Sequence, residues 1–262
     1  GFDGVLLMAK RPHLSPLDST EDQLLQVKET LEARHMQLIG LACYNDFLLP
    51  AAAEVPVRDM QLAYLEQCCR ITAFLGGKLL RVFTGYERAD MVFTAQWEQV
   101  VSALQECGDR AARYGITVAV QNHHDLAVET SALELLLAEV DRANVTAGYD
   151  AWSPFLRGEN IYEGARRMAK HMVMTIAANY LRFPRYTYDA AVVNYRPQEP
   201  DFVKATSMEA GAIDYELFFK GLKEGGFDGW AVYEMCSPVI GGPSLDNLDQ
   251  KAAEFLSFMR SL

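Results

Sequence analysis

The chain lacks an excess of basic residues. It carries 24 Lys and Arg against 35 Asp and Glu, so its formal net charge at pH 7 is −11. Proteins that hold a nucleic-acid backbone present surfaces rich in Lys and Arg. This acidic balance therefore argues against a nucleic-acid partner.

Long apolar runs and metal-binding cysteine patterns are also missing. No stretch of about 18 apolar residues occurs, and the first residues do not form a basic-then-apolar leader, so we expect neither a membrane span nor a signal peptide. The five cysteines are scattered, odd in number and free of metal-ligand spacing. Such usage suits a reducing compartment, and we expect a cytoplasmic protein.

What the chain does contain is enough apolar sequence for one large core. Half of its 262 residues are hydrophobic and 23% are charged, a balance that excludes a disordered chain. The length suits a single α/β barrel. We therefore expect one domain over residues 1–262.

Strand-like and helix-like segments alternate along the chain. The strand-like runs cover residues 4–9, 38–44, 79–84, 116–121, 145–152, 172–178 and 229–235. Segments with helical periodicity cover residues 22–35, 58–75, 96–113, 132–141, 161–169 and 215–224. This alternation predicts parallel βαβ units and a TIM (β/α)8-type barrel. Seven strands are one fewer than such a barrel holds, so we expect its first strand and helix to be absent from this chain.

The longest segment without a regular pattern covers residues 181–212, where Pro184, Pro197 and Pro200 interrupt a run of Tyr and Arg. We interpret it as an irregular insertion after a strand. Insertions of this length in a compact domain are usually functional. We expect it to be a lid over a site or a contact in a homo-oligomer.

A polar cluster directly follows the apolar, β-branched run over 116–121. Its members are Gln121, Asn122, His123 and His124. In α/β barrels the residues after the strands line the carboxyl-terminal face, where active sites form. Strand alternation places Gln121 and His123 on one face, and Asn122 and His124 on the other. We therefore expect Gln121 and His123 to meet other strand-end side chains at this mouth.

Motifs spread along the chain carry a family resemblance. They are Gly-Phe-Asp-Gly-Val-Leu-Leu-Met at 1–8, Arg-Val-Phe-Thr-Gly at 81–85, Gln-Asn-His at 121–123, Gly-Tyr-Asp at 148–150, Gly-Ala-Ile-Asp-Tyr at 211–215, Gly-Phe-Asp-Gly at 226–229, and Glu234. Over essentially its whole length the chain resembles the xylose-isomerase-like TIM barrel superfamily, which holds sugar phosphate isomerases and epimerases and AP endonuclease family 2.

The resemblance implies a divalent metal, Mn²⁺, Mg²⁺ or Co²⁺, held by two Glu, one Asp and one His at the ends of different strands. The Asp matches Asp150 and the second Glu matches Glu234, whereas the first Glu falls on Gln121. The His falls on Ile176, or on Met174 if the alignment shifts by two residues. An amide can coordinate a cation but cannot act as a base, and isoleucine can do neither. We therefore expect a depleted metal site on Gln121, Asp150 and Glu234 that binds weakly or not at all.

The resemblance and the strand ends also suggest roles in catalysis and substrate binding. Glu234 is the remaining acid/base, and His123 could replace the missing imidazole or serve as a base. Arg182 matches an Arg that similar enzymes use near the substrate. His13 follows the first strand and so reaches the same mouth, and Trp152 offers a flat face to a sugar ring.

Three functions stay open on this basis. The first is an isomerase or epimerase that uses metal-assisted proton transfer next to the carbonyl of a sugar or polyol. The second is a lyase or dehydratase on an oxidised sugar or glycoside, in which one base, His123 or Glu234, suffices. The third is a non-catalytic relative that binds a sugar or serves as a subunit. Plain structural interpretations also remain, such as a helix cap for Asp150 and a core amide for Gln121.

Overall fold

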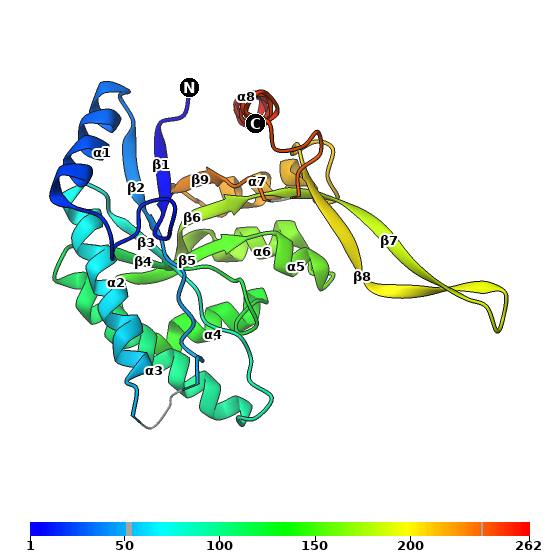
Figure 1. Cartoon of the computed structure of the whole chain (residues 1–262), viewed down its shortest axis with the longest axis horizontal. Helices are drawn as coiled ribbons and strands as arrows, with labels where there is room; N and C mark the ends of the chain where they lie inside the picture. The colour runs from blue at the N-terminus through cyan, green and yellow to red at the C-terminus, as the bar shows by residue number, and fades with distance from the viewer. Residues whose placement is uncertain (51–53, 237) are drawn as a thin grey trace.

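A parallel sheet of seven strands forms the centre of the computed structural model, which describes residues 1–50, 54–236 and 238–262. The sheet curls into a barrel with the helices on its outside (Figure 1). Every strand of this seven-stranded sheet falls on a segment predicted from the sequence, which confirms the α/β barrel. In spatial order, which is also chain order, the strands are β1 (Gly4–Met8), β2 (Gln37–Ala42), β3 (Leu79–Val82), β4 (Thr117–Val120), β5 (Val145–Asp150), β6 (Met172–Ala177) and β9 (Trp230–Tyr233).

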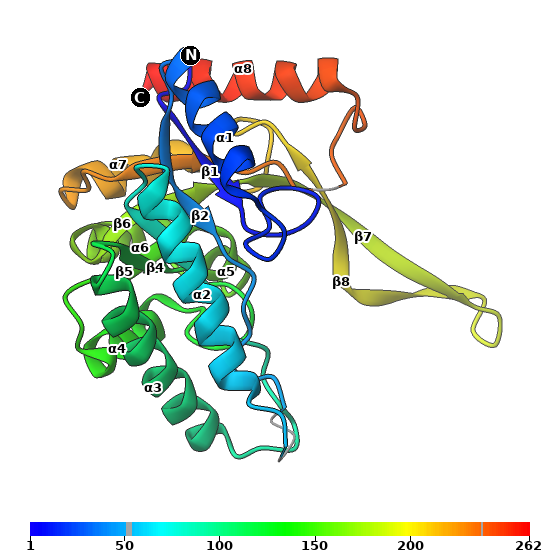
Figure 2. The same ribbon diagram turned by 60° about the vertical axis from the view of Figure 1, so that its left-hand side comes forward.

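Helices that follow the strands cover the outer face of the sheet (Figure 2). Thr20 illustrates how they start: its side chain accepts from the Gln23 N–H and the Gln23 side chain accepts from the Thr20 N–H, a capping box. In the described part of the chain no helix is long and apolar enough to cross a membrane. The helices at predicted segments are α1 (Glu21–Ala33), α2 (Val57–Phe74), α3 (Phe93–Ala112), α4 (Thr130–Val140), α6 (Ile161–Met168) and α7 (Tyr215–Glu224), and the short α5 (Trp152–Leu156) and η1 (Ala169–His171) flank α6.

The strands divide their side chains between two apolar clusters. Strand residues such as Leu80, Val118 and Val120 face the helices and join the main core. Alternate residues face inward and form a smaller cluster inside the barrel. This inner cluster contains Ile39, Leu79, Ala119, Met174 and Ile176.

A helix outside the predicted set, α8 (Leu245–Ser261), lies beside β1 and the N-terminus (Figures 1 and 2). Its Phe255 ring stacks on Tyr233 with centroids 4.5 Å apart, and on Phe2 with centroids 6.2 Å apart. Among the described residues β1 and β9 do not pair with each other, and a groove between them is lined by both strands and α8. Apolar side chains recur along α8 with helical spacing, at Leu248, Ala252, Phe255 and Met259.

Most of the segment 181–212 is not irregular, which corrects the sequence interpretation for residues 181–206; residues 207–212 contain neither strand nor helix. Strands β7 (Asn179–Asp189) and β8 (Asn194–Thr206) form an antiparallel two-stranded ribbon that projects from the barrel (Figures 1 and 2). In the sequence, Pro184, Pro197 and Pro200 argue against strands because proline cannot donate to a ladder. In a ribbon of two strands both members are edge strands, so each proline can turn its missing N–H toward solvent.

Candidate active site

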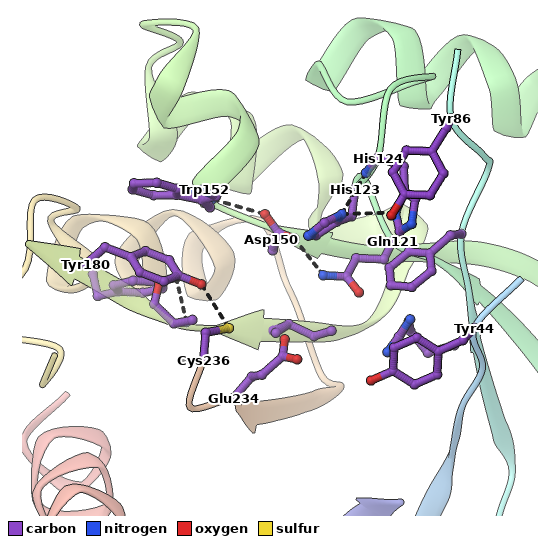
Figure 3. A pocket seen from close by; sticks show the side chains of 15 residues that line it. Tyr44, Tyr86, Gln121, His123, His124, Asp150, Trp152, Tyr180, Glu234 and Cys236 are labelled. Carbon is purple, nitrogen blue, oxygen red and sulfur yellow. Dashed lines mark hydrogen bonds between the residues drawn. The ribbon is translucent and has the colours of Figure 1, made fainter. Parts of the chain in front are cut away.

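A pocket of about 250 Å³ lies at the carboxyl ends of the strands (Figure 3). Pockets for drug-sized ligands usually measure roughly 300–1,000 Å³, so this volume suits a smaller molecule, of monosaccharide size. The lining combines aromatic rings with a few charged and polar groups, a composition typical of ligand sites. The rings belong to Tyr44, Phe83, Tyr86, Trp152, Tyr180 and Tyr215.

Strand alternation explains why residues from different strands meet in this pocket. Residues two positions apart on a strand share a face. Leu79, Ala119 and Met174 belong to the apolar cluster inside the barrel, with Val232 packed against it. The residue two positions after each of these lines the pocket, and those residues are Arg81, Gln121, Ile176 and Glu234. The inner apolar cluster is therefore the floor of the pocket.

Two amides hold Asp150 in place. Gln121 Nε2 donates to Asp150 Oδ2 at 2.8 Å (Figure 3). Asn122 Oδ1 accepts from the Asp150 N–H at 2.7 Å, and Asn122 Nδ2 donates to the Asp150 carbonyl at 3.0 Å. Asp150 Oδ1 accepts from the backbone N–H of Trp152 at 3.0 Å and of Ser153 at 3.5 Å. Asp150 thus caps the first turn of α5 while it faces the pocket.

The pKa of the Asp150 carboxyl lies well above its usual value. Burial raises its pKa to about 6, because the side chain is removed from water. Hydrogen bonds from Gln121, Ser153 and Trp152 oppose this rise, as does the positive charge of Arg81. The carboxyl therefore changes its protonation state close to neutral pH.

The two histidines lie together at the rim of the pocket. Their Nδ1 atoms are 3.0 Å apart, and the His124 ring packs between Phe83 and Tyr86 at centroid distances of 4.1 and 4.2 Å. Burial lowers the pKa of His123, and it lowers the pKa of His124 to about 4 with help from His123 and Arg81. Both imidazoles are therefore neutral at neutral pH.

The expected separation of His123 and His124 onto opposite faces is wrong. Strand β4 ends at Val120, and His124 has a positive φ of 72°. This turn breaks the strand alternation and brings His124 into the same pocket as His123 and Gln121. Asn122 does turn away, toward the backbone of β5.

Glu234 directly follows β9 and its side chain enters the pocket from the side opposite the histidines (Figure 3). Its backbone N–H donates to the Ala177 carbonyl at 3.0 Å, which fixes the strand end. No hydrogen bond or ion pair to its carboxylate occurs among the described residues. Beside it, the Tyr180 hydroxyl donates to Cys236 Sγ at 3.1 Å. Glu234 is therefore a carboxylate available to a ligand.

Arg81 lines the pocket but was not among the predicted site residues; the sequence named it only as part of the motif at 81–85. It is 3% exposed, and its Nη1 donates to the Cys43 carbonyl at 2.8 Å. Its guanidinium carbon lies 4.0 Å from the Phe83 ring centroid and 5.1 Å from that of Tyr44. The sequence did offer one signal, which was a charged residue inside an otherwise apolar strand. Such a residue faces either the helices or the barrel interior, so it could have been considered for the site.

Two of the predicted substrate-binding residues lie away from this pocket, and one lies in it. His13 is exposed and belongs to a separate surface depression near Arg11 and Asp18. Arg182 lies on the ribbon, where its guanidinium pairs with Asp201 at 2.8 Å. Trp152 lines the pocket and packs on Tyr180, with ring centroids 4.4 Å apart.

The residues at the implied metal positions do not fit a divalent cation. Gln121 turns its amide nitrogen, not its oxygen, toward Asp150. Ile176 offers no ligand atom, and the cation of Arg81 lines the same pocket. In the parts of the chain that the structure describes, no three His, Cys, Asp or Glu side chains are grouped so that they could hold a metal ion.

Curated proteins similar in sequence are inosose dehydratases. That of Lacticaseibacillus casei is 25% identical over 147 residues, which are 53% of this chain and 47% of that protein. That of Geobacillus thermodenitrificans (strain NG80-2) is 26% identical over 161 residues, which are 58% of this chain and 52% of that protein. The chain thus spans about half the length of the curated relatives that it matches.

Solved structures with the same fold include sugar epimerases. D-Allulose 3-epimerase from Methylomonas sp. superposes with a TM-score of 0.75 at 15% identity, covering 100% of this chain and 87% of that one. The 3-keto-D-glucoside 4-epimerase of E. coli gives 0.74 at 16% identity, covering 100% and 90%. The family model described as xylose isomerase-like TIM barrel matches residues 1–262. The chain therefore belongs to the xylose isomerase-like TIM barrel family.

Proposed function

We propose that this chain is an enzyme that removes the proton next to the carbonyl of a keto-sugar or keto-polyol and then expels a hydroxyl group, as a dehydratase or lyase. The observation that carries the proposal is the asymmetry of the two acid/base positions. Glu234 presents a carboxylate with no partner among the described residues. The second position holds Gln121, whose amide cannot accept a proton at neutral pH. The site thus offers one carboxylate base, and an elimination needs only one.

The chemistry of such an elimination can be balanced with Glu234 alone. The carboxylate takes the proton from the carbon next to the carbonyl, and the electron pair of the C–H bond forms the double bond of an enolate. The negative oxygen of the enolate then re-forms the carbonyl, the C=C electron pair moves to form a double bond to the following carbon, and the hydroxyl on that carbon leaves with its bonding electrons. Glu234 returns its proton to that hydroxyl, so water departs and the base is regenerated. The aromatic walls, Trp152 and Tyr180 among them, pack against the sugar ring and exclude bulk water.

The similarity to inosose dehydratases and the fold shared with keto-sugar epimerases support this substrate class. An inosose, a 3-keto-D-glucoside and D-allulose therefore form a suitable first panel. No step of the proposed elimination runs through a metal ion, since the residues at the implied metal positions do not fit one.

The test is an NMR assay in D₂O with chelator-treated enzyme. With at least one ketone of the panel we expect loss of the signal of the proton next to the carbonyl, together with signals of a dehydrated product. Glu234→Gln should lower the rate by about 10²- to 10⁴-fold, because the general base is lost. Glu29→Gln, an exposed position on α1, is the matched control and should retain full activity. A Glu234→Gln enzyme as active as wild type would sink the proposal.

Epimerisation is the second candidate, and one observation favours it. His123 is neutral at neutral pH and lines the same pocket as Glu234, so it could take the proton from the face of the carbon opposite Glu234, and the imidazolium formed could return a proton to that face of the enolate. In the same assay an epimerase would give a deuterated stereoisomer and no loss of water. His123→Asn would then still exchange the proton but would no longer invert the centre.

A further inference from the structure

Arg81 is a buried cation whose hydrogen-bonding capacity is not used up by the described chain. Among the described residues only Nη1 has a protein acceptor, the Cys43 carbonyl at 2.8 Å. In the part of the chain that the structure describes, its buried Nε has no hydrogen-bond partner, and no carboxylate forms an ion pair with the guanidinium. A buried charge is costly unless it is paired. The pocket therefore contains a positively charged group that can still donate hydrogen bonds to a ligand.

A buried acceptor without a partner lies on the neighbouring strand. Gln121 is 3% exposed, and its Oε1 has no hydrogen-bond donor among the described residues, because Nε2 is the atom that faces Asp150. Arg81 pairs in register with Ala119, two residues before Gln121, so both side chains rise from the same floor of the barrel. The same pocket is thus lined by Arg81, a donor without an acceptor, and by Gln121, an acceptor without a donor, among the described residues.

The charge of Arg81 acts on the whole pocket. It lowers the pKa values of His123, His124 and Asp150, which come from two other strand ends. The faces of Phe83 and Tyr44 hold the planar guanidinium, so its orientation is set before a ligand arrives. A fixed charge of this kind stabilises a developing anion without reorganisation. Arg81 is the only Lys or Arg among the described residues that line the pocket.

We propose that Arg81 takes over the electrostatic task that a divalent metal performs in other members of the family. The guanidinium binds the carbonyl oxygen of an α-hydroxycarbonyl ligand, and Gln121 Oε1 accepts a hydrogen bond from the adjacent hydroxyl. For catalysis the inference rests on the proposed function, since the enolate oxygen formed after proton removal gains negative charge beside Arg81. For binding it stands by itself, because it requires only the donor and the acceptor.

Glycolate is a suitable probe because it carries a carboxylate next to a hydroxyl and nothing else. Calorimetric titration of chelator-treated protein should show binding in the millimolar range, as expected for a ligand of few atoms. Arg81→Gln should weaken binding about 10- to 100-fold, the usual effect of losing a hydrogen bond to a charged group. Acetate, which lacks the hydroxyl, should bind more weakly than glycolate. Arg113→Gln, at a side chain that is 67% exposed, is the matched control and should bind as wild type does.

Added Mn²⁺ should leave the affinity of the wild-type protein for glycolate unchanged. Binding that appears only with Mn²⁺, equal binding by Arg81→Gln, or no binding by wild type would each overturn the inference. If Arg81→Gln does not fold, Arg81→Lys is used in its place. It keeps the positive charge, so its affinity for glycolate should be measurable but lower than that of the wild-type protein. A protein that binds glycolate but exchanges no proton in any keto-sugar would overturn the proposed function alone.

Discussion

At the scale of single residues, the site depends on how three polar side chains share their hydrogen bonds. Asn122 joins the end of β4 to the backbone of Asp150, and Gln121 donates to the carboxyl of the same residue. This arrangement keeps a carboxyl buried at 5% exposure. Burial in turn raises its pKa to about 6. The hydrogen-bond network therefore fixes Asp150 in the pocket, but the burial of its carboxylate lowers the stability of the folded state.

That cost predicts a pH-dependent effect of Asp150→Asn. The folded-state pKa lies above its unfolded value of 3.8, so the group favours folding below pH 4 and this contribution is lost as the pH rises to about 6. The shift corresponds to roughly 2 to 3 kcal/mol. The free energy of unfolding of Asp150→Asn, relative to wild type, should therefore rise by about that amount between pH 4 and pH 7. Urea unfolding at both pH values measures it, and an unchanged difference would contradict it.

At the scale of elements, the ribbon and α8 contribute differently to the fold. The ribbon projects beyond the barrel, and Tyr186, Tyr188 and Tyr195 on it are more than half exposed. Helix α8 instead buries Phe255 and Phe258 against the open side of the sheet. The barrel should therefore tolerate loss of the ribbon but not a weakened α8.

Shortening the ribbon tests the first half of this contrast. Arg182 and Val203 are a cross-strand pair, so replacing residues 183–202 by Asn-Gly would join them through a two-residue hairpin turn. We expect the midpoint of thermal unfolding to change by only a few degrees, because mainly exposed residues and surface ion pairs are lost. Light scattering on the same variant would show whether the ribbon holds a homo-oligomer together. Non-cooperative unfolding would contradict the expectation.

Asn179 at the base of the ribbon provides the contrasting variant. Its Nδ2 donates to the carbonyls of Met208 and Ile213 at 2.7 and 2.8 Å, and its Oδ1 accepts from the Ile213 N–H at 3.0 Å. Asn179→Ala removes these bonds inside the core and should destabilise the fold far more than the shortened ribbon does.

Truncating Phe255 tests the second half. Phe255 is 3% exposed and stacks on Tyr233 with an interplanar angle of 8°. Phe255→Ala should lower the free energy of unfolding by about 3 to 5 kcal/mol, because it leaves a cavity between α8 and β9. Leu245→Ala, at a side chain that is 77% exposed at the start of α8, should change it by less than about 0.5 kcal/mol. Denaturant titrations of both variants measure their free energies of unfolding, and an equal decrease in the two would contradict the stabilising role of α8.

At the scale of the whole molecule, the net charge of −11 opposes the compact state by self-repulsion. Salt screens that repulsion, whereas the exposed ion pairs that salt also weakens contribute little. The midpoint of thermal unfolding should therefore rise by about 1 to 3 °C between low and physiological ionic strength. Calorimetry in a weakly binding salt such as NaCl measures it, and a fall would show that attractive ion pairs dominate.

The sequence by itself determined the barrel and several residues at its mouth, namely Gln121, His123, Asp150, Trp152 and Glu234. Apolar runs with strand periodicity alternate with helical segments, and this local pattern persists in the fold. Gln121, Asp150 and Glu234 each end or follow a strand, and parallel strands bring their carboxyl ends to one face. Their convergence was therefore predictable without knowledge of the packing.

Only the tertiary structure decided what surrounds these residues. Arg81 could face the helices or the barrel interior, and its register against β4 decides in favour of the interior. His124 enters the pocket because the backbone takes a positive φ after β4 ends. Gln121 turns its nitrogen to Asp150, which leaves its oxygen without a donor among the described residues. These outcomes depend on contacts between segments far apart in the sequence, and local periodicity carries no information about such contacts.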